Sequence, residues 1–204
     1  MEQQQQGEIA VAAEAGLKRR HVHKFGGSSL ADPVCYRRVA SIVEQQVGGD
    51  ELIVVSAAGK TTNRLIQLVE LAEAGDEAAG EAISALQAYQ QSLIDGLLEG
   101  ELQLDLSKQL ADDMQLIAKT LEGQFDRFAR NGLLAFGEVW SARLLAALLT
   151  SRGDKAIWLD ARSFLRAEDG ALVKVDTALS SELLKARLAE HAGRIVVTGF
   201  IAAD

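Results

Sequence analysis

The stretch 51-ELIVVSAAG-59 is a short, continuous apolar run that ends in small residues. Such a run is typical of a strand buried on both faces, as strands of parallel sheets are. Further strands are expected over residues 20–27, 155–161 and 194–201, with a weaker one over 171–175. The run at 51–59 therefore predicts a parallel sheet, and the other strands supply its neighbours.

Helical segments separate the strands. Asp32 and Pro33 indicate one helix start, and further helices are expected from residue 137 and over 179–192. Strands that alternate with helices predict the α/β class, here a three-layer sandwich with a mostly parallel sheet covered by helices on both faces. In such a sheet, ligands gather at the carboxyl ends of the strands, where the loops open.

Residues 62–130 are rich in Leu, Ala, Gln and Glu and are broken by glycines. Their helical spacing predicts three or four helices. Two of these, over 79–98 and 104–130, are expected to form a long antiparallel hairpin, whose apolar stripes serve packing rather than catalysis.

The composition is that of an ordinary globular protein, since 48% of the 204 residues are hydrophobic and 25% are charged. The net charge of −8 argues against a nucleic-acid partner, because phosphate backbones require clustered Lys and Arg. Cys35 is the sole cysteine and there are three histidines, so neither an internal disulfide nor a metal-binding cluster is expected.

Targeting and membrane signals are not evident in the sequence. No apolar run approaches the roughly 20 residues that span a bilayer. Residues 1–16 lack the basic start and apolar centre of a signal peptide. We interpret residues 1–19 as a disordered, glutamine-rich lead-in, and we expect a cytoplasmic protein without a membrane partner.

The first chemical motif, 24-KFGGSSLAD-32, closes the opening strand. Gly26 and Gly27 have no side chains, so phosphate oxygens could approach their backbone N–H groups closely. Lys24 supplies a mobile positive charge for a transferring phosphoryl group, and Ser28 adds a donor. A Gly-Gly pair after a strand is also a common tight turn, so both interpretations stay open at this point.

The second motif, 54-VVSAAGKTTN-63, ends the next strand with small residues and hydroxyls. Ser56 and Thr62 are placed to hydrogen-bond a small polar substrate. Taken alone, Thr62 is better explained as a helix N-cap. Lys60 is either a second phosphate-facing cation or a solvated loop residue.

Two further motifs carry charged side chains, 136-FGEVWSARLL-145 and 158-WLDARSFLRAE-168. Glu138 is expected at a helix start, where an acid complements the helix dipole; the functional alternative is a carboxylate that binds a substrate ammonium. Asp160 and Arg162 close a strand, so either could face a pocket, although a surface ion pair is the simpler interpretation.

In this order and spacing, the four motifs resemble the aspartate kinase family of the amino-acid-kinase fold. The family's opening signature is Lys-Phe-Gly-Gly-Thr-Ser, and Ser28 replaces its Thr while keeping a hydroxyl. The stretch 56–63 is similar to the family's Ser-Ala-x-x-x-x-Thr-Asn. Gly137, Glu138 and Ser141 match its Gly-Glu-x-x-Ser element.

The resemblance covers residues 20–202 and points to one branch of the family. The stretches KFGGSSLAD, GEVWSARL, WLDARSFLRAE and VVTGFI are similar to the kinase portion of enzymes that fuse aspartokinase to homoserine dehydrogenase, in particular those of the methionine branch.

The resemblance implies a homo-oligomeric kinase that phosphorylates the side-chain carboxylate of aspartate with ATP, whose Mg²⁺ is bound through the nucleotide. This reaction opens the pathway to lysine, threonine and methionine. Lys24 would stabilise the transferring phosphoryl group, and Glu138 would lie near the ammonium of aspartate. The other implied contacts are Gly26, Gly27 and Ser28 for the phosphates, and Ser56 and Thr62 for aspartate.

The family places a Gly-Arg-Gly/Asn-Gly-Ser-Asp segment after the strand that corresponds to 194–201, and this sequence stops before it, at Asp204. We therefore expect residues 20–204 to be the N-terminal, aspartate-binding part of a kinase catalytic domain. Without the nucleotide-binding half, the 204-residue chain itself is expected to be inactive.

Three alternatives are kept. A kinase of the same fold could act on another small acid, such as glutamate or acetylglutamate, although acetylglutamate has no charged nitrogen for Glu138 to bind. A non-catalytic fragment is the second alternative. A dinucleotide-dependent dehydrogenase is disfavoured because no Gly-x-Gly-x-x-Gly follows a strand.

Overall fold

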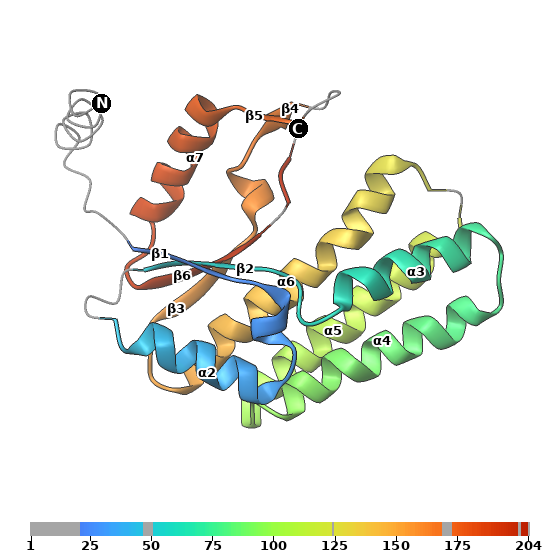
Figure 1. Cartoon of the computed structure of the whole chain (residues 1–204), viewed down its shortest axis with the longest axis horizontal. Helices are drawn as coiled ribbons and strands as arrows, with labels where there is room; N and C mark the ends of the chain where they lie inside the picture. The colour runs from blue at the N-terminus through green and yellow to red at the C-terminus, as the bar shows by residue number, and fades with distance from the viewer. Residues whose placement is uncertain (1–20, 47–50, 124, 169–172, 200, 204) are drawn as a thin grey trace.

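The computed structural model describes residues 21–46, 51–123, 125–168, 173–199 and 201–203 (Figure 1). The lead-in predicted for residues 1–19 lies outside these residues. Within them, helices and parallel strands alternate along the chain, as the sequence predicts.

The central sheet has four parallel strands in the order β1 (Val22–Phe25), β2 (Leu52–Val55), β6 (Arg194–Thr198) and β3 (Ala156–Leu159). A separate antiparallel pair joins β4 (Ala167–Glu168) to β5 (Lys174–Val175). The prediction of a mostly parallel sheet is confirmed. The last strand in the described residues, β6, lies between β2 and β3.

Helices cover both faces of this sheet (Figure 1). On one face, α2 (Pro33–Glu44) and α6 (Arg127–Ser151) bury Ile53, Val55 and Val196 in the larger apolar core. On the other face, α7 (Thr177–Ala189) covers Ile195 and Val197. Successive strand residues point to opposite faces, so the continuous apolar run of β6 is what a sheet covered on both faces requires.

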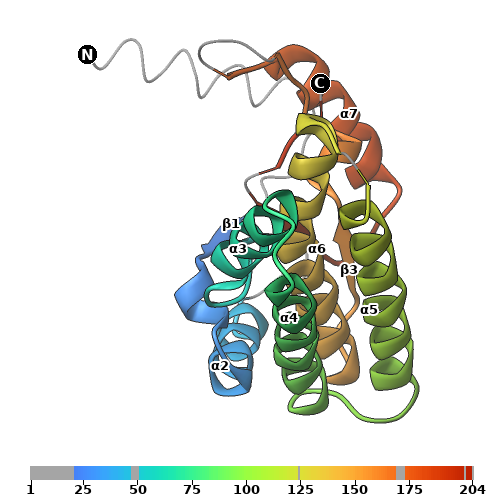
Figure 2. The ribbon, with the colours of Figure 1, turned by 90° about the vertical axis from the view of Figure 1, so that its right-hand side faces the viewer.

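Three helices form an outer layer beside α6: α3 (Thr61–Glu73), α4 (Ala78–Asp95) and α5 (Gly100–Leu121). Figure 2 shows α4 and α5 running side by side along α6, which confirms the predicted hairpin. The predicted end of its second helix at residue 130 is wrong, because α5 ends at Leu121.

The long helix α6 begins ten residues before the predicted start at residue 137. Its start is set by Asp126, whose Oδ1 accepts a hydrogen bond from the N–H of Ala129 at 2.9 Å. In the described part of the chain, α6 is long and apolar enough to cross a membrane, which the prediction for apolar runs missed. However, 78% of its most apolar window is buried inside the domain, as expected of the core helix against which the sheet packs.

A buried ion cluster closes the amino-terminal edge of the sheet. Arg194 is 6% exposed and lies in ion pairs with Asp154 and with Glu51, whose Oε2 is 2.8 Å from the Arg194 Nε. Arg194 also donates hydrogen bonds to the carbonyl oxygens of Val43 and Gln46, both at 3.1 Å. One side chain therefore joins the starts of β2 and β6 to the end of α2 and to the turn before β3.

Candidate functional site

Two loops meet at the carboxyl edge of the sheet, where β1 and β2 end side by side. The N–H of Ser56 donates to the carbonyl of Phe25 at 3.1 Å, and the N–H of Gly59 donates to the carbonyl of Gly27 at 2.9 Å. The first and second motifs of the sequence, 24–32 and 54–63, are thus brought together as one surface.

Gly27 lets these loops touch. A Cβ on Gly27 would lie 2.7 Å from the carbonyl oxygen of Ala57 and 2.9 Å from that of Gly59, which no side chain tolerates. Close packing of two loops is therefore sufficient reason for glycine at this position. It is compatible with phosphate binding, which stays a prediction.

The two serines of the first motif lie in a short helix of their own, ahead of the next long helix. Residues Gly27–Leu30 form a short 3-10 helix, η1, in which Ser28 is exposed. Helix α2 begins at Pro33, where Asp32 Oδ1 accepts a hydrogen bond from the N–H of Cys35 at 2.8 Å. The predicted helix start at Asp32 and Pro33 is confirmed.

Lys24 is exposed on β1, and its ammonium lies beside Gly26, the first residue of the glycine turn. A Cβ placed on Gly26 would be 3.6 Å from Lys24 Nζ. The positive charge therefore lies over the backbone of the loop, on the side that is open to solvent.

Glu138 lies in the interior of α6, so its predicted position at a helix start is wrong. The helix dipole acts within the first turn and cannot explain an acid at this depth. Only 5% of Glu138 is exposed, and its Oε1 accepts a long hydrogen bond, 3.4 Å, from the N–H of Ala57. Burial raises the pKa of this carboxyl above its ordinary value, while the hydrogen bond from Ala57 opposes the rise.

The neighbour of Glu138, Gly137, allows the helix to approach the loop. A Cβ on Gly137 would lie 2.8 Å from the Cβ of Ala57 and 3.4 Å from Cγ2 of Thr61. Gly137 and Glu138 therefore act together. The glycine lets the loop after β2 pack closely against α6, and the glutamate accepts a hydrogen bond from the backbone of that loop.

The two predicted hydroxyl residues lie on the loop after β2 and on the helix that follows it. Ser56 follows β2 directly and is half-buried. Thr62 is the second residue of α3, so its interpretation as an N-cap is wrong; Lys60 occupies the cap position without a side-chain hydrogen bond. Thr61, which precedes Thr62, is fully buried, and its hydroxyl donates a hydrogen bond to the carbonyl of Ala58 at 2.6 Å.

Asp160 and Arg162 form a local pair at the end of β3. The Nη2 of Arg162 lies 2.6 Å from Oδ2 of Asp160, and this neighbour raises the pKa of the arginine. Asp160 also accepts a hydrogen bond from the backbone N–H of Arg162 at 2.9 Å. The pair satisfies its own charges and caps a turn, which agrees with the simpler of the two interpretations.

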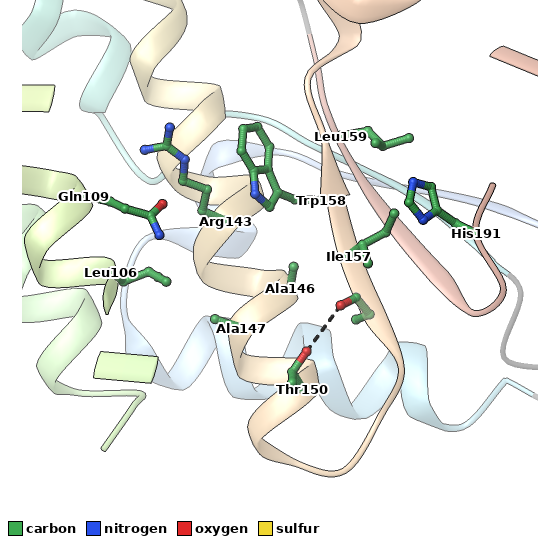
Figure 3. Close-up of a pocket in the computed structure, with 11 residues that line it drawn as sticks. Leu106, Gln109, Arg143, Ala146, Ala147, Thr150, Ile157, Trp158, Leu159 and His191 are labelled. Atoms are coloured by element: carbon green, nitrogen blue, oxygen red, sulfur yellow. Dashed lines mark hydrogen bonds between the residues drawn. The ribbon is translucent and has the colours of Figure 1, made fainter. Parts of the chain in front are cut away.

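A cavity of about 440 Å³ lies elsewhere, along the edge strand β3 (Figure 3). Figure 3 shows Arg143 and Trp158 on the side of α6, with Ile157 and Leu159 on the opposite face of the strand. The Nη1 of Arg143 is held by Asp113 at 2.5 Å, and its guanidinium carbon lies 5.0 Å from the centre of the Trp158 ring. Arg143, Trp158 and Leu159 of the third and fourth motifs line this cavity, but none of the predicted site residues does, so the candidate site is the loop surface at the carboxyl edge.

Comparison with known proteins shows which family the chain matches and which relatives it resembles. Residues 19–204 match the model of the amino acid kinase family. Bifunctional aspartokinase/homoserine dehydrogenase 2 of Escherichia coli (strain K12) is 45% identical over 194 residues, which covers 95% of this chain and 24% of that protein. Lysine-sensitive aspartokinase 3 of the same organism is 27% identical over 186 residues, covering 90% of this chain and 41% of that protein.

A solved aspartokinase structure has the same fold over most of this chain. The structure of E. coli aspartokinase III in complex with aspartate and ADP superimposes with a TM-score of 0.75 at 28% identity, over 90% of this chain and 41% of that chain. The chain thus spans about a quarter of the bifunctional relative and less than half of the monofunctional one.

Proposed function

The chain belongs to the amino acid kinase family, and from this premise we propose that it forms the aspartate-binding part of an aspartate kinase. The proposed reaction transfers the γ-phosphoryl group of ATP to the side-chain carboxylate of L-aspartate. The aspartokinases among its relatives support this assignment, as does the solved homologue that holds aspartate and ADP.

The observation that carries the proposal is the buried carboxylate of Glu138. None of the ion pairs between described residues involves Glu138, and its one described partner outside its own helix is the N–H of Ala57 at 3.4 Å. A buried carboxylate without a cation carries a desolvation cost, which a bound ammonium would offset. A substrate with a free α-amino group supplies that cation.

The opposite side of the surface suits the phosphoryl group. Lys24 presents an exposed ammonium over the turn at Gly26 and Gly27, and the exposed hydroxyl of Ser28 follows. Phosphoryl transfer depends on positioning and electrostatic stabilisation rather than on covalent help from the protein. Lys24 would neutralise charge on the transferring group, and Mg²⁺ would enter bound to the phosphates of ATP.

Substrate choice is the direct test. ADP release by the full-length protein should depend on aspartate, with little turnover on glutamate and none on N-acetylglutamate. Rapid turnover on glutamate would reassign the chain to a kinase for another small acid. Absence of turnover with every acid would contradict the kinase proposal itself.

Glu138→Gln is expected to weaken aspartate binding by about tenfold or more, because a charge-assisted contact is replaced by a neutral one. Affinity for ATP should stay nearly unchanged. Titration calorimetry on the full-length protein measures both. Equal aspartate affinity in mutant and parent would show that Glu138 serves packing only.

The same carboxyl predicts a pH dependence. An ammonium binds the ionised form, and the pKa of Glu138 is raised by burial. Aspartate affinity should therefore be greatest above that raised pKa and should fall as the pH drops through it. The Glu138→Gln variant should lose this component of the pH profile, since its amide does not titrate in this range.

A further inference from the structure

Helix α4 carries none of the residues that the motifs single out, yet two adjacent side chains on it contact both loops of the candidate site. Tyr89 Oη donates a hydrogen bond to the carbonyl of Ala31 at 2.9 Å. Gln90 Nε2 donates to Oγ1 of Thr61 at 2.9 Å. Ala31 ends the loop after β1, and Thr61 is the first residue of α3, directly after the loop that follows β2.

The Tyr89 hydroxyl sits where the two loops join. A Cβ on Gly59 would lie 2.7 Å from Tyr89 Oη, so the hydroxyl packs directly on that glycine. Gly59 has a φ of +54°, a conformation that favours glycine, and its N–H bonds the carbonyl of Gly27. Removing the hydroxyl would free both the end of the first loop and the glycine that links it to the second.

The ring of Tyr89 is fixed independently of its hydroxyl. The guanidinium carbon of Arg64, in the first turns of α3, lies 4.1 Å from the ring centre. The hydroxyl is protonated at neutral pH, as a tyrosine ordinarily is, and burial raises its pKa further.

Gln90 holds the second loop from within the core. It is 4% exposed, and its amide bonds Thr61, which in turn donates to the carbonyl of Ala58. The Cγ2 of Thr61 faces Gly137 on α6, next to Glu138. Thr61 is therefore held between α4 and α6, and its position sets that of Thr62.

We infer that Tyr89 and Gln90 are positioning residues, which fix the loop of Lys24 and Gly27 relative to the loop of Ser56 and Thr62. The inference rests on the proposed function, because the two loops are assigned to the phosphoryl group and to aspartate. If the hydrogen bonds from Tyr89 and Gln90 on α4 are lost, each loop still keeps its own binding groups. What is lost is the alignment of the two reacting groups, and a misplacement of about 1 Å can cost on the order of a hundredfold in rate.

The test uses Tyr89→Phe, which leaves the ring in place, and Gln90→Met, which keeps the length of the side chain. In the full-length protein, each variant should lower kcat by about tenfold or more while KM for aspartate and ATP changes by less than about threefold. A rise in the KM for aspartate with unchanged kcat would overturn the inference.

Gln91→Met is the matched control. Gln91 is the next residue on the same helix, and its amide bonds Asp95 and Ser107, both at 2.8 Å, away from the two loops. This variant disturbs the α4–α5 contact to a similar degree but should leave kcat within about twofold of the parent. An equal loss of kcat in all three variants would reduce Tyr89 and Gln90 to ordinary packing residues and overturn the inference.

Hydrogen exchange separates this inference from the kinase assignment. In the 204-residue chain, the amide of Gly59 should exchange about tenfold faster or more in Tyr89→Phe than in the parent or in Gln91→Met. If the full-length protein proved inactive, the proposed function would fail. Faster exchange at Gly59 would still support the clamp formed by α4, that is, the positioning of the two loops by Tyr89 and Gln90. Unchanged exchange in an active enzyme would overturn the clamp and leave the function intact.

Discussion

Lys24→Ala in the full-length protein should lower kcat by on the order of 10²–10³, with a much smaller effect on the KM for aspartate. The ammonium of Lys24 lies over the glycine turn, on the open side of the loop, where charge on a transferring phosphoryl group would develop. An interaction made mainly in the transition state lowers the barrier without greatly tightening the ground state, so its loss falls on kcat.

Lys108→Ala controls for the change of net charge. Lys108 is exposed on α5 and pairs with Asp112 at 3.2 Å, one turn along the same helix. This substitution should leave kcat within about twofold of the parent, since exposed pairs contribute little. If Lys24→Ala raised only the KM for aspartate, Lys24 would serve ground-state binding and its proposed catalytic role would be wrong.

Arg194→Ala should lower the free energy of unfolding by about 3–5 kcal/mol, because it leaves Glu51 buried without its cation. Glu51 is 1% exposed, and Arg194 also holds Asp154 and two carbonyl oxygens at the end of α2. For a chain of this size the midpoint of thermal unfolding should fall by roughly 6–20 °C. Urea and thermal denaturation of the 204-residue chain measure both quantities.

Arg152→Ala is the matched comparison for this effect. The Nε of Arg152 pairs with Glu44 at 2.6 Å, also near the end of α2, but the two side chains are 37% and 28% exposed. Its loss should cost about 1 kcal/mol or less, since solvent screens such a pair. A double variant, Arg194→Met with Glu51→Gln, should recover part of the stability, because it removes the fully buried charge of Glu51 together with that of Arg194 and leaves only the half-buried Asp154 without its cation. Equal losses of unfolding free energy for Arg194→Ala and Arg152→Ala would show that burying the ion cluster does not increase its contribution to stability.

The order and type of most elements could be predicted from the sequence because they depend on local patterns. The apolar run ending in Val55 predicts a buried strand, and Asp32 followed by Pro33 predicts a helix start. The reason for glycine at Gly27 is not local, because a Cβ there would clash with Ala57 and Gly59, which belong to the loop after the next strand.

Helix boundaries were less secure, and one of them changed the meaning of a site residue. The sequence pattern predicts one helix over residues 104–130 and the next from Gly137. In the structure the cap is Asp126, an N-capping residue type that the prediction did not use. Glu138 consequently lies inside a core helix, where a dipole explanation no longer applies.

The sequence by itself therefore determined the alternation of strands and helices, the glycine turn and the set of polar residues at the carboxyl ends of β1 and β2. Tertiary structure decided which helix side chains meet the loops at these strand ends: Glu138 on α6 reaches Ala57 across 81 residues, and Tyr89 on α4 reaches Ala31 across 58. It also placed β6 between β2 and β3 and buried Arg194 beside Glu51. The physical reason is that periodicity and turn chemistry act over a few neighbouring residues, whereas desolvation and pairing of a side chain depend on whatever the folded chain packs against it.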